Sequence, residues 1–268
     1  KIVLEEVKPY ADDVKVDALG NVLAVKHGRG AKRPRVMLDA HMDEVGLMIK
    51  QIGKDGLLHI RAVGGIDPRV LPAKRVLVGK EAIPGVIGVK PIHLITREEE
   101  QQVIKIDQLY IDIGAKNKED AEGVVHLGDT VTFATQCQFF GRIGMGKAFD
   151  DRAGCAVLAE LIKERYDVEL VAVFTVQEEV GLRGAKTAAT FANPDVAIIL
   201  ECPPADDLPG FARADSQGLL GSGVQIRMFD PSAIANPRFA KLAIDVARAA
   251  GVVPSTVADI LNGRAACF

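Results

Sequence analysis

A run of nine residues from Val168 to Val176 is almost continuously apolar, and this run constrains the fold more than any other feature. A strand that is apolar at successive positions is buried on both faces, as in the central strands of α/β sheets. Apolar runs at residues 35–40 and 196–200 fit further buried strands. Residues 151–165 place apolar side chains at the spacing of one helix face. The sequence therefore predicts an α/β fold.

Composition limits the class of protein. Hydrophobic residues make up 48% of the chain and charged residues 26%, which is typical of globular proteins and excludes disorder as the main state. The net charge of -3 argues against nucleic acid as a partner, because phosphate-binding proteins are usually far more basic. We found neither a membrane-spanning apolar run nor the apolar stretch of a signal peptide. We therefore expect a cytoplasmic protein without a membrane partner.

The cysteines support the same compartment. They are widely and irregularly spaced, which gives neither a zinc finger nor a dense disulfide framework. Reduced, mostly buried thiols are the simplest interpretation. The four positions are Cys137, Cys155, Cys202 and Cys267.

Residues 62–142 follow a different pattern from the rest of the chain. Short β-like runs recur there, and Gly, Pro and charged turns separate them. Such regular short strands predict a small barrel or sandwich. We therefore predict a discontinuous α/β domain, residues 1–61 and 143–268, interrupted by a β module at residues 62–142. Because the chain starts at Lys1 within a helical pattern and ends at Phe268 without a closing segment, we also expect it to be a fragment of a longer protein.

One histidine and several carboxylates lie at or just beyond the ends of the predicted strands, where open α/β sheets bind their ligands. Alternate residues of an extended chain share a face, so Asp43 can accept the ring N–H of a metal-bound His41. Successive residues point apart, so one of Glu178 and Glu179 can bind metal while the other acts as a general base. The set comprises His41, Asp43, Asp150, Asp151, Glu178, Glu179 and Glu201.

Each cluster also fits an ordinary structural role. His41 can be a surface histidine beside solvated acids, Asp150 or Asp151 can cap a helix, and Glu178 can stand at a solvated strand end. The ordered set is more informative than any single cluster. Nitrogen and oxygen ligands of this kind suit zinc, cobalt or manganese, and a bridging carboxylate favours a site for two metals.

The chain resembles the glutamyl aminopeptidase/cellulase M family of dinuclear metalloaminopeptidases, which includes deblocking and tetrahedral (TET) aminopeptidases. The resemblance rests on residues 39–46, 149–152, 177–185 and 201–210 and covers nearly the whole chain. It implies a mixed-sheet, phosphorylase/hydrolase-like catalytic domain interrupted by a β-barrel dimerisation domain. It also implies peptide substrates with a free N-terminus, and dimers that assemble into a dodecamer.

The resemblance further implies a role for each matching residue. His41 would bind the first metal, with Asp43 orienting it and Glu201 completing that site. Asp150 would bridge both metals, Glu179 would bind the second, and Glu178 would be the general base. Two divalent ions, zinc or cobalt, are the implied cofactors. The family's second metal takes a further histidine near the C-terminus, whereas this sequence contains none after His126.

Other activities remain open at this level. The same fold also serves amidohydrolases such as deacylases and carboxypeptidases. A non-catalytic metal-binding protein is the alternative if the C-terminal histidine is truly absent. Endoglucanase activity does not fit the sequence, because Glu178 and Glu179 are adjacent and diverge, whereas glycosidases place two carboxyl groups about 5–9 Å apart across the scissile bond. The chain also contains no Trp for a sugar platform.

Overall fold

The structure is a computed structural model. It describes residues 1–30, 32–210, 218–230, 232–252 and 254–258. The chain divides into two compact units, Lys1–Cys202 and Pro203–Phe268.

The first unit contains a five-stranded mixed sheet with the strand order β1-β2-β12-β3-β13. The central strand β12 runs parallel to β3 and antiparallel to β2, and β13 runs parallel to β3. The bounds are Asp13–Val16 (β1), Val22–Lys26 (β2), Arg35–His41 (β3), Glu169–Thr175 (β12) and Val196–Ile199 (β13). This sheet confirms the predicted α/β class.

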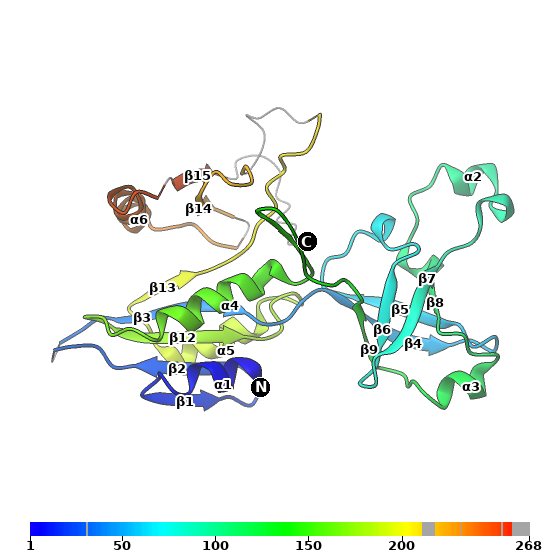
Figure 1. The fold of residues 1–268 in the computed structure, drawn as a ribbon, viewed down its shortest axis with the longest axis horizontal. Coiled ribbons are helices and arrows are strands. Elements are labelled where there is room, and N and C mark those ends of the chain that lie inside the picture. Colours follow the sequence, from blue (N-terminus) through cyan, green and yellow to red (C-terminus); the bar gives the residue numbers. More distant parts are fainter. Residues whose placement is uncertain (31, 211–217, 231, 253, 259–268) are drawn as a thin grey trace. The chain divides into compact units, whose positions relative to one another are not determined.

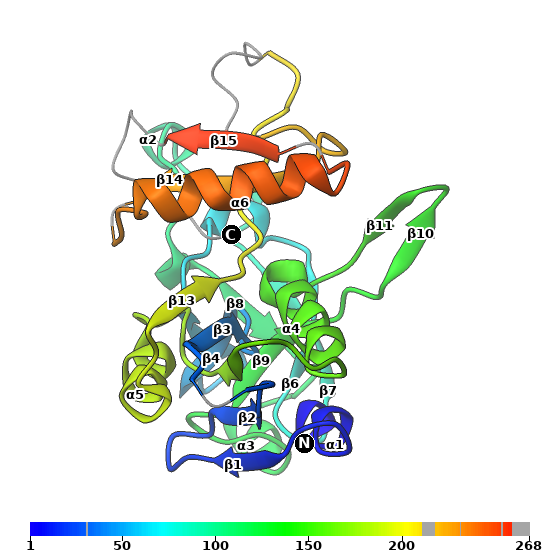
Figure 2. The same ribbon diagram turned by 90° about the vertical axis from the view of Figure 1, so that its left-hand side faces the viewer.

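Helices cover both faces of the sheet, which explains the continuous apolar pattern of β12. Val171 and Val173 pack with α5 (Arg183–Ala192) on one face. Phe174, like the other alternate residues of β12, packs with α1 (Ile2–Val7) and α4 (Phe149–Leu161) on the other. Figure 2 shows α5 on one side of the sheet and α4 with α1 on the opposite side.

A closed barrel with the strand order β4-β5-β8-β7-β6-β9 follows β3 in the chain (Figure 1). Its interior is an apolar cluster that includes Leu47, Ile60 and Ile111. The strands are Gly46–Ile52 (β4), Leu58–Val63 (β5), Arg75–Val78 (β6), Ile83–Gly88 (β7), Tyr110–Asp112 (β8) and Thr130–Phe133 (β9). The fold thus contains the predicted inserted barrel.

The strand pairing shows that the barrel starts at Gly46 and not at residue 62, the predicted boundary. Strand β4 pairs with β5 and with β9, which closes the barrel, and both β4 and β5 direct alternate side chains into its core. Sequence alone did not separate them from the sheet strands, because they follow β3 as further short apolar runs. Two short helices, α2 (Arg97–Glu100) and α3 (Lys118–Glu122), lie in the barrel connections.

A two-stranded hairpin, β10 (Gln138–Phe140) with β11 (Ile143–Met145), forms a separate sheet between β9 and α4 in the chain. In the second unit, β14 (Val224–Phe229) pairs in parallel with β15 (Pro254–Ala258), and α6 (Pro237–Ala249) connects them. Asn236 caps α6, as its position before Pro237 predicts, by accepting the backbone N–H groups of residues 238 and 239. None of the helices described for this chain combines the length and apolar character needed to cross a bilayer.

Candidate metal centre

His41 is the centre of a cluster of carboxylates at one edge of the sheet. It is the last residue of β3 and pairs in register with Thr175, the last residue of the parallel strand β12. Parallel strands end at the same edge, so the segments after β12 and β13 and the start of α4 meet there. The His41 side chain is only 1% exposed. Its Nε2 atom lies 3.1 Å from Asp150 Oδ1 and 3.6 Å from Glu201 Oε2.

The predicted metal ligands therefore come together from four separate chain segments. Two groups have possible ligand atoms within 4.8 Å of one another, and they share His41. One group adds Asp150 and Glu201, and the other adds Glu178 and Glu179. The first group contains the three residues expected to bind the first metal, and their role as ligands stays a prediction. The bridging position of Asp150 stays a prediction, since Asp150 belongs to only one of the groups.

Asp43 contacts this cluster in a way that the sequence did not indicate. Its carboxylate accepts the backbone N–H of Glu178 at 3.1 Å and that of Glu179 at 3.2 Å. His41 Nδ1 lies 3.1 Å from the Asp43 carbonyl oxygen but 3.7 Å from the carboxylate oxygen Oδ1. The Asp43 carboxylate thus orients the two glutamates through their backbone, and the Asp43 carbonyl is the nearer partner of the His41 ring.

The charge of the cluster is strongly negative. Among the residues that the structure describes, all ion pairs of Asp43, Asp150, Glu178 and Glu201 are with His41. Burial alone would lower the pKa of His41, but hydrogen bonds to Asp150 and Glu201 raise it to about 11. Carboxylates crowded in a partly buried site need cations, so this donor set of one imidazole and several carboxylates fits divalent metal ions.

The two glutamates have shifted pKa values. Burial raises the pKa of Glu178 above its usual range, and neighbouring acids contribute in the same direction. Burial likewise raises the pKa of Glu179 to about 7. A carboxylate with a raised pKa is a better proton acceptor, which is the property required of a general base.

Two further carboxylates lie buried next to the cluster. Asp151 is fully buried, and its Oδ1 accepts the N–H of Gly154, so it caps the start of α4 while Asp150 faces His41. Asp39 is 3% exposed. Burial raises the pKa of Asp39 to about 6 and that of Asp151 to about 7. One side-chain oxygen of each lacks a hydrogen-bond partner among the described residues.

Sequence reasoning also missed two thiols and an ion-pair group at this site. Cys155 Sγ donates to the His41 carbonyl at 3.2 Å, and Cys202 Sγ lies 3.7 Å from Asp151 Oδ1. Mostly buried thiols were expected, whereas among the described cysteines Cys155 is buried, Cys202 is half-buried and Cys137 is exposed. Their irregular spacing in the sequence did not indicate these positions. The Cys267 position lies outside the described residues.

The ion-pair group centres on Glu44. Its carboxylate lies 2.5 Å from Lys147 Nζ and 3.3 Å from Arg152. In the sequence, Lys147 and Arg152 flank the Asp150–Asp151 pair, and Glu44 directly follows Asp43. These opposite charges beside two predicted ligand segments were the available signal for the ion pairs.

Comparison with known proteins agrees with this geometry. The model of the M42 glutamyl aminopeptidase family matches residues 20–261. The chain belongs to this family. The glutamyl aminopeptidase of Lactococcus lactis is 36% identical over 248 residues, which cover 88% of this chain and 68% of that protein.

Solved M42-like structures share the fold. An aminopeptidase from the archaeon Desulfurococcus kamchatkensis superimposes with a TM-score of 0.90 at 35% identity, covering 96% of this chain and 73% of that one. The TET1 peptidase of Pyrococcus horikoshii superimposes with a TM-score of 0.80 at 35% identity, covering 96% and 77%. The M42 chain described here spans about two thirds of the length of its curated relatives.

Proposed function

We propose that this M42 chain is the metal-binding part of an aminopeptidase that removes N-terminal residues from peptides. The observation that carries the proposal is the pair of donor groups that share His41 at the sheet edge. Family membership supports the reaction class. Two divalent ions, zinc or cobalt, are the proposed cofactors, because the donors are one imidazole and several carboxylates.

The proposed ligands are His41, Asp150 and Glu201 for one ion, and Glu179 with the bridging Asp150 for the other. When bound, such a pair of cations would polarise the scissile carbonyl and lower the pKa of the attacking water. Asp43 holds the backbone of residues 178 and 179, which keeps the ligand and the base in fixed positions relative to each other.

Glu178 is the proposed general base. It is partly buried beside His41, and its raised pKa favours proton uptake from the attacking water. The same carboxyl group then delivers the proton to the leaving amine. The excess of carboxylates also favours a substrate whose α-amino group carries a positive charge, which distinguishes a free N-terminus from an acylated one.

We further propose that the protein is a homo-oligomer in which the barrel forms the dimer contact and dimers build a dodecamer. Support comes from the Pyrococcus horikoshii TET1 peptidase, which can assemble into a tetrahedron or a large octahedral shell. The proposed catalytic domain is discontinuous around the barrel. Sedimentation of the full-length protein, with and without residues of the barrel surface changed to charges, tests this assembly.

Hydrolysis of a panel of aminoacyl-anilides, with Zn²⁺ or Co²⁺ added, tests the activity. Glu178→Gln should lower kcat by about 10²–10⁴-fold while metal binding persists, because the general base is lost and the proposed ligands stay. Glu81→Gln, which changes an exposed glutamate of a barrel turn, is the matched control and should leave kcat unchanged. Cleavage that is insensitive to Glu178→Gln contradicts the role of Glu178.

The substrate arms separate the rival activities. N-acetylated aminoacyl-anilides test a deacylase, and peptides with a blocked N-terminus and a free C-terminus test a carboxypeptidase. Faster cleavage of either class than of free aminoacyl-anilides overturns the aminopeptidase assignment. Metal binding without any cleavage by the full-length protein supports a non-catalytic role.

A further inference from the structure

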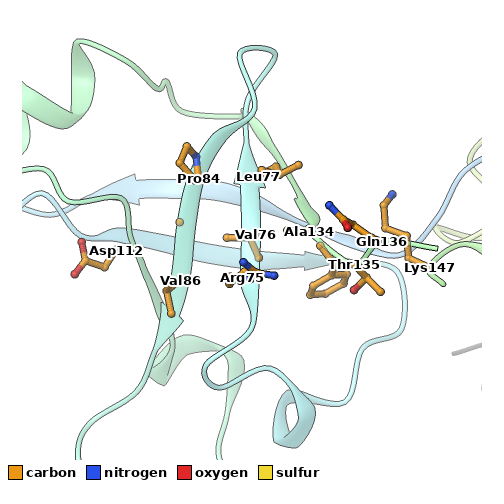
Figure 3. Close-up of a pocket in the computed structure, with 12 residues that line it drawn as sticks. Arg75, Val76, Leu77, Pro84, Val86, Asp112, Ala134, Thr135, Gln136 and Lys147 are labelled. Carbon is orange, nitrogen blue, oxygen red and sulfur yellow. The ribbon is translucent and has the colours of Figure 1, made fainter. Parts of the chain in front are cut away.

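A groove of about 480 Å³ lies on the barrel, and the proposed chemistry makes no use of it. Its floor is largely apolar and includes Leu77, Pro84 and Val86 of β6 and β7. In Figure 3 Asp112 stands towards one end of the groove and Lys147 with Gln136 towards the other. The volume falls within the range of about 300–1,000 Å³ that is common for ligand pockets.

The Lys147 end connects the groove to the metal centre. Lys147 lines the groove, and its ammonium group pairs with Glu44, the residue next to Asp43. Lys147 also lies three residues before Asp150, a separation that spans at most about 11 Å of chain. An extended peptide advances about 3.3 Å per residue, so three residues of a peptide cover about the same distance as the chain from Asp150 to Lys147.

The groove offers backbone groups as well as apolar surface. Beyond β9, Ala134 N–H bonds to the Arg75 carbonyl at 3.0 Å, whereas Thr135 and Gln136 are exposed and make no hydrogen bond among the described residues. The backbone N–H and C=O groups of these two residues are thus available to pair with a peptide strand. The apolar floor beside it accepts side chains from such a strand.

The positive charge of Arg75 favours the C-terminal end of a peptide over its N-terminal end. Arg75 lines the groove and forms no ion pair within the described part of the chain. Its guanidinium can therefore take a carboxylate in the two-pronged geometry that arginine prefers. The groove thus fits a chain that is apolar along its length and ends in a free carboxylate.

We propose that this groove binds the downstream part of the peptide substrate, from about the third to the fifth residue, with Arg75 holding the C-terminal carboxylate of short peptides. The proposal rests on the proposed function, because it assigns the occupant as the substrate of the same site. It predicts that affinity rises with peptide length up to about five residues, and that apolar residues at these positions bind more tightly than polar ones.

Peptide binding to the metal-free protein tests the groove separately from catalysis. The protein contains no Trp, so the fluorescence of a tryptophan at the fourth position of an apolar pentapeptide reports binding directly. Val86→Gln should weaken binding about tenfold, because a half-exposed valine of the groove floor loses its apolar contact. Val124→Gln, at a valine of similar exposure outside the groove, should leave the dissociation constant unchanged.

A second arm tests Arg75. The C-terminally amidated pentapeptide should bind the wild-type protein several-fold more weakly than the free acid, and Arg75→Gln should remove this difference. Thermal unfolding of each variant establishes that it folds. Equal affinity of wild type and Val86→Gln, or equal affinity for dipeptide and pentapeptide, overturns the groove. Aminoacyl-anilide cleavage is scored independently, so loss of activity with length-dependent binding intact contradicts only the proposed function.

Discussion

Asp43→Asn is the most direct test of how this M42 metal centre is organised. The two oxygens of the Asp43 carboxylate accept the backbone N–H groups of Glu178 and Glu179. Asparagine keeps one acceptor oxygen, but its amide nitrogen would face the second N–H donor. One charge-assisted hydrogen bond is then lost, and the segment that carries the proposed base and a proposed ligand is held at one point instead of two.

The expected magnitude follows from this loss. A hydrogen bond to a charged group contributes about 1.5–3 kcal/mol, and the 25% exposure of the Asp43 side chain places this bond near the lower end of that range. A loss of about 1.5–2 kcal/mol corresponds to roughly a 10–30-fold change in an equilibrium constant. Groups that orient metal ligands have effects of about 10–100-fold on metal affinity, which agrees. We therefore expect Zn²⁺ to bind about 10–30-fold more weakly.

Isothermal titration calorimetry with Zn²⁺, in competition with a chelator of known affinity, measures this change. Asp120→Asn is the control, because the Asp120 carboxylate also accepts a backbone N–H but belongs to the barrel. The control should lose some thermal stability and keep its Zn²⁺ affinity. Unchanged Zn²⁺ affinity in Asp43→Asn, with the protein folded, would falsify the idea that Asp43 positions the ligand segment.

Three further predictions concern the pH dependence of stability, the contact between Gly64 and Glu179, and the hydrophobic core. Burial raises the pKa of Asp39 from 3.8 to about 6 and that of Asp151 from 3.8 to about 7, so the native state keeps protons that the unfolded state has released. The melting temperature of the metal-free protein should therefore fall as the pH rises from about 4 to 7, and Asp151→Asn should make this fall smaller. Gly64→Ala should weaken Zn²⁺ binding, since Gly64 has a φ of +84° and an added Cβ would lie 3.2 Å from the Glu179 Cβ; unchanged titration curves would refute this contact. Phe174→Ala should lower the free energy of unfolding by about 3–5 kcal/mol in urea titrations, because this fully buried ring joins β12 to the helices of one face.

The local elements were predictable because short-range patterns determine them. The apolar run at residues 168–176 predicted the central strand, and its alternate residues indeed meet helices on opposite faces. The cap at Asn236 was visible as an Asn-Pro pair before an amphipathic stretch. The start of the barrel was not predictable, because β4 and β5 look like sheet strands until their partners are known.

The same division holds for the metal centre. The sequence by itself determined which chemical groups are available: a histidine and carboxylates, each directly after a strand or at a helix start. Only the tertiary structure decided that Asp150 and Glu201 meet the Nε2 atom of His41, and that the Asp43 carboxylate bonds to the backbone of residues 178 and 179 rather than to the ring. The physical reason is that strand periodicity fixes the direction of a side chain, whereas the distance between groups that lie more than a hundred residues apart depends on strand order and register.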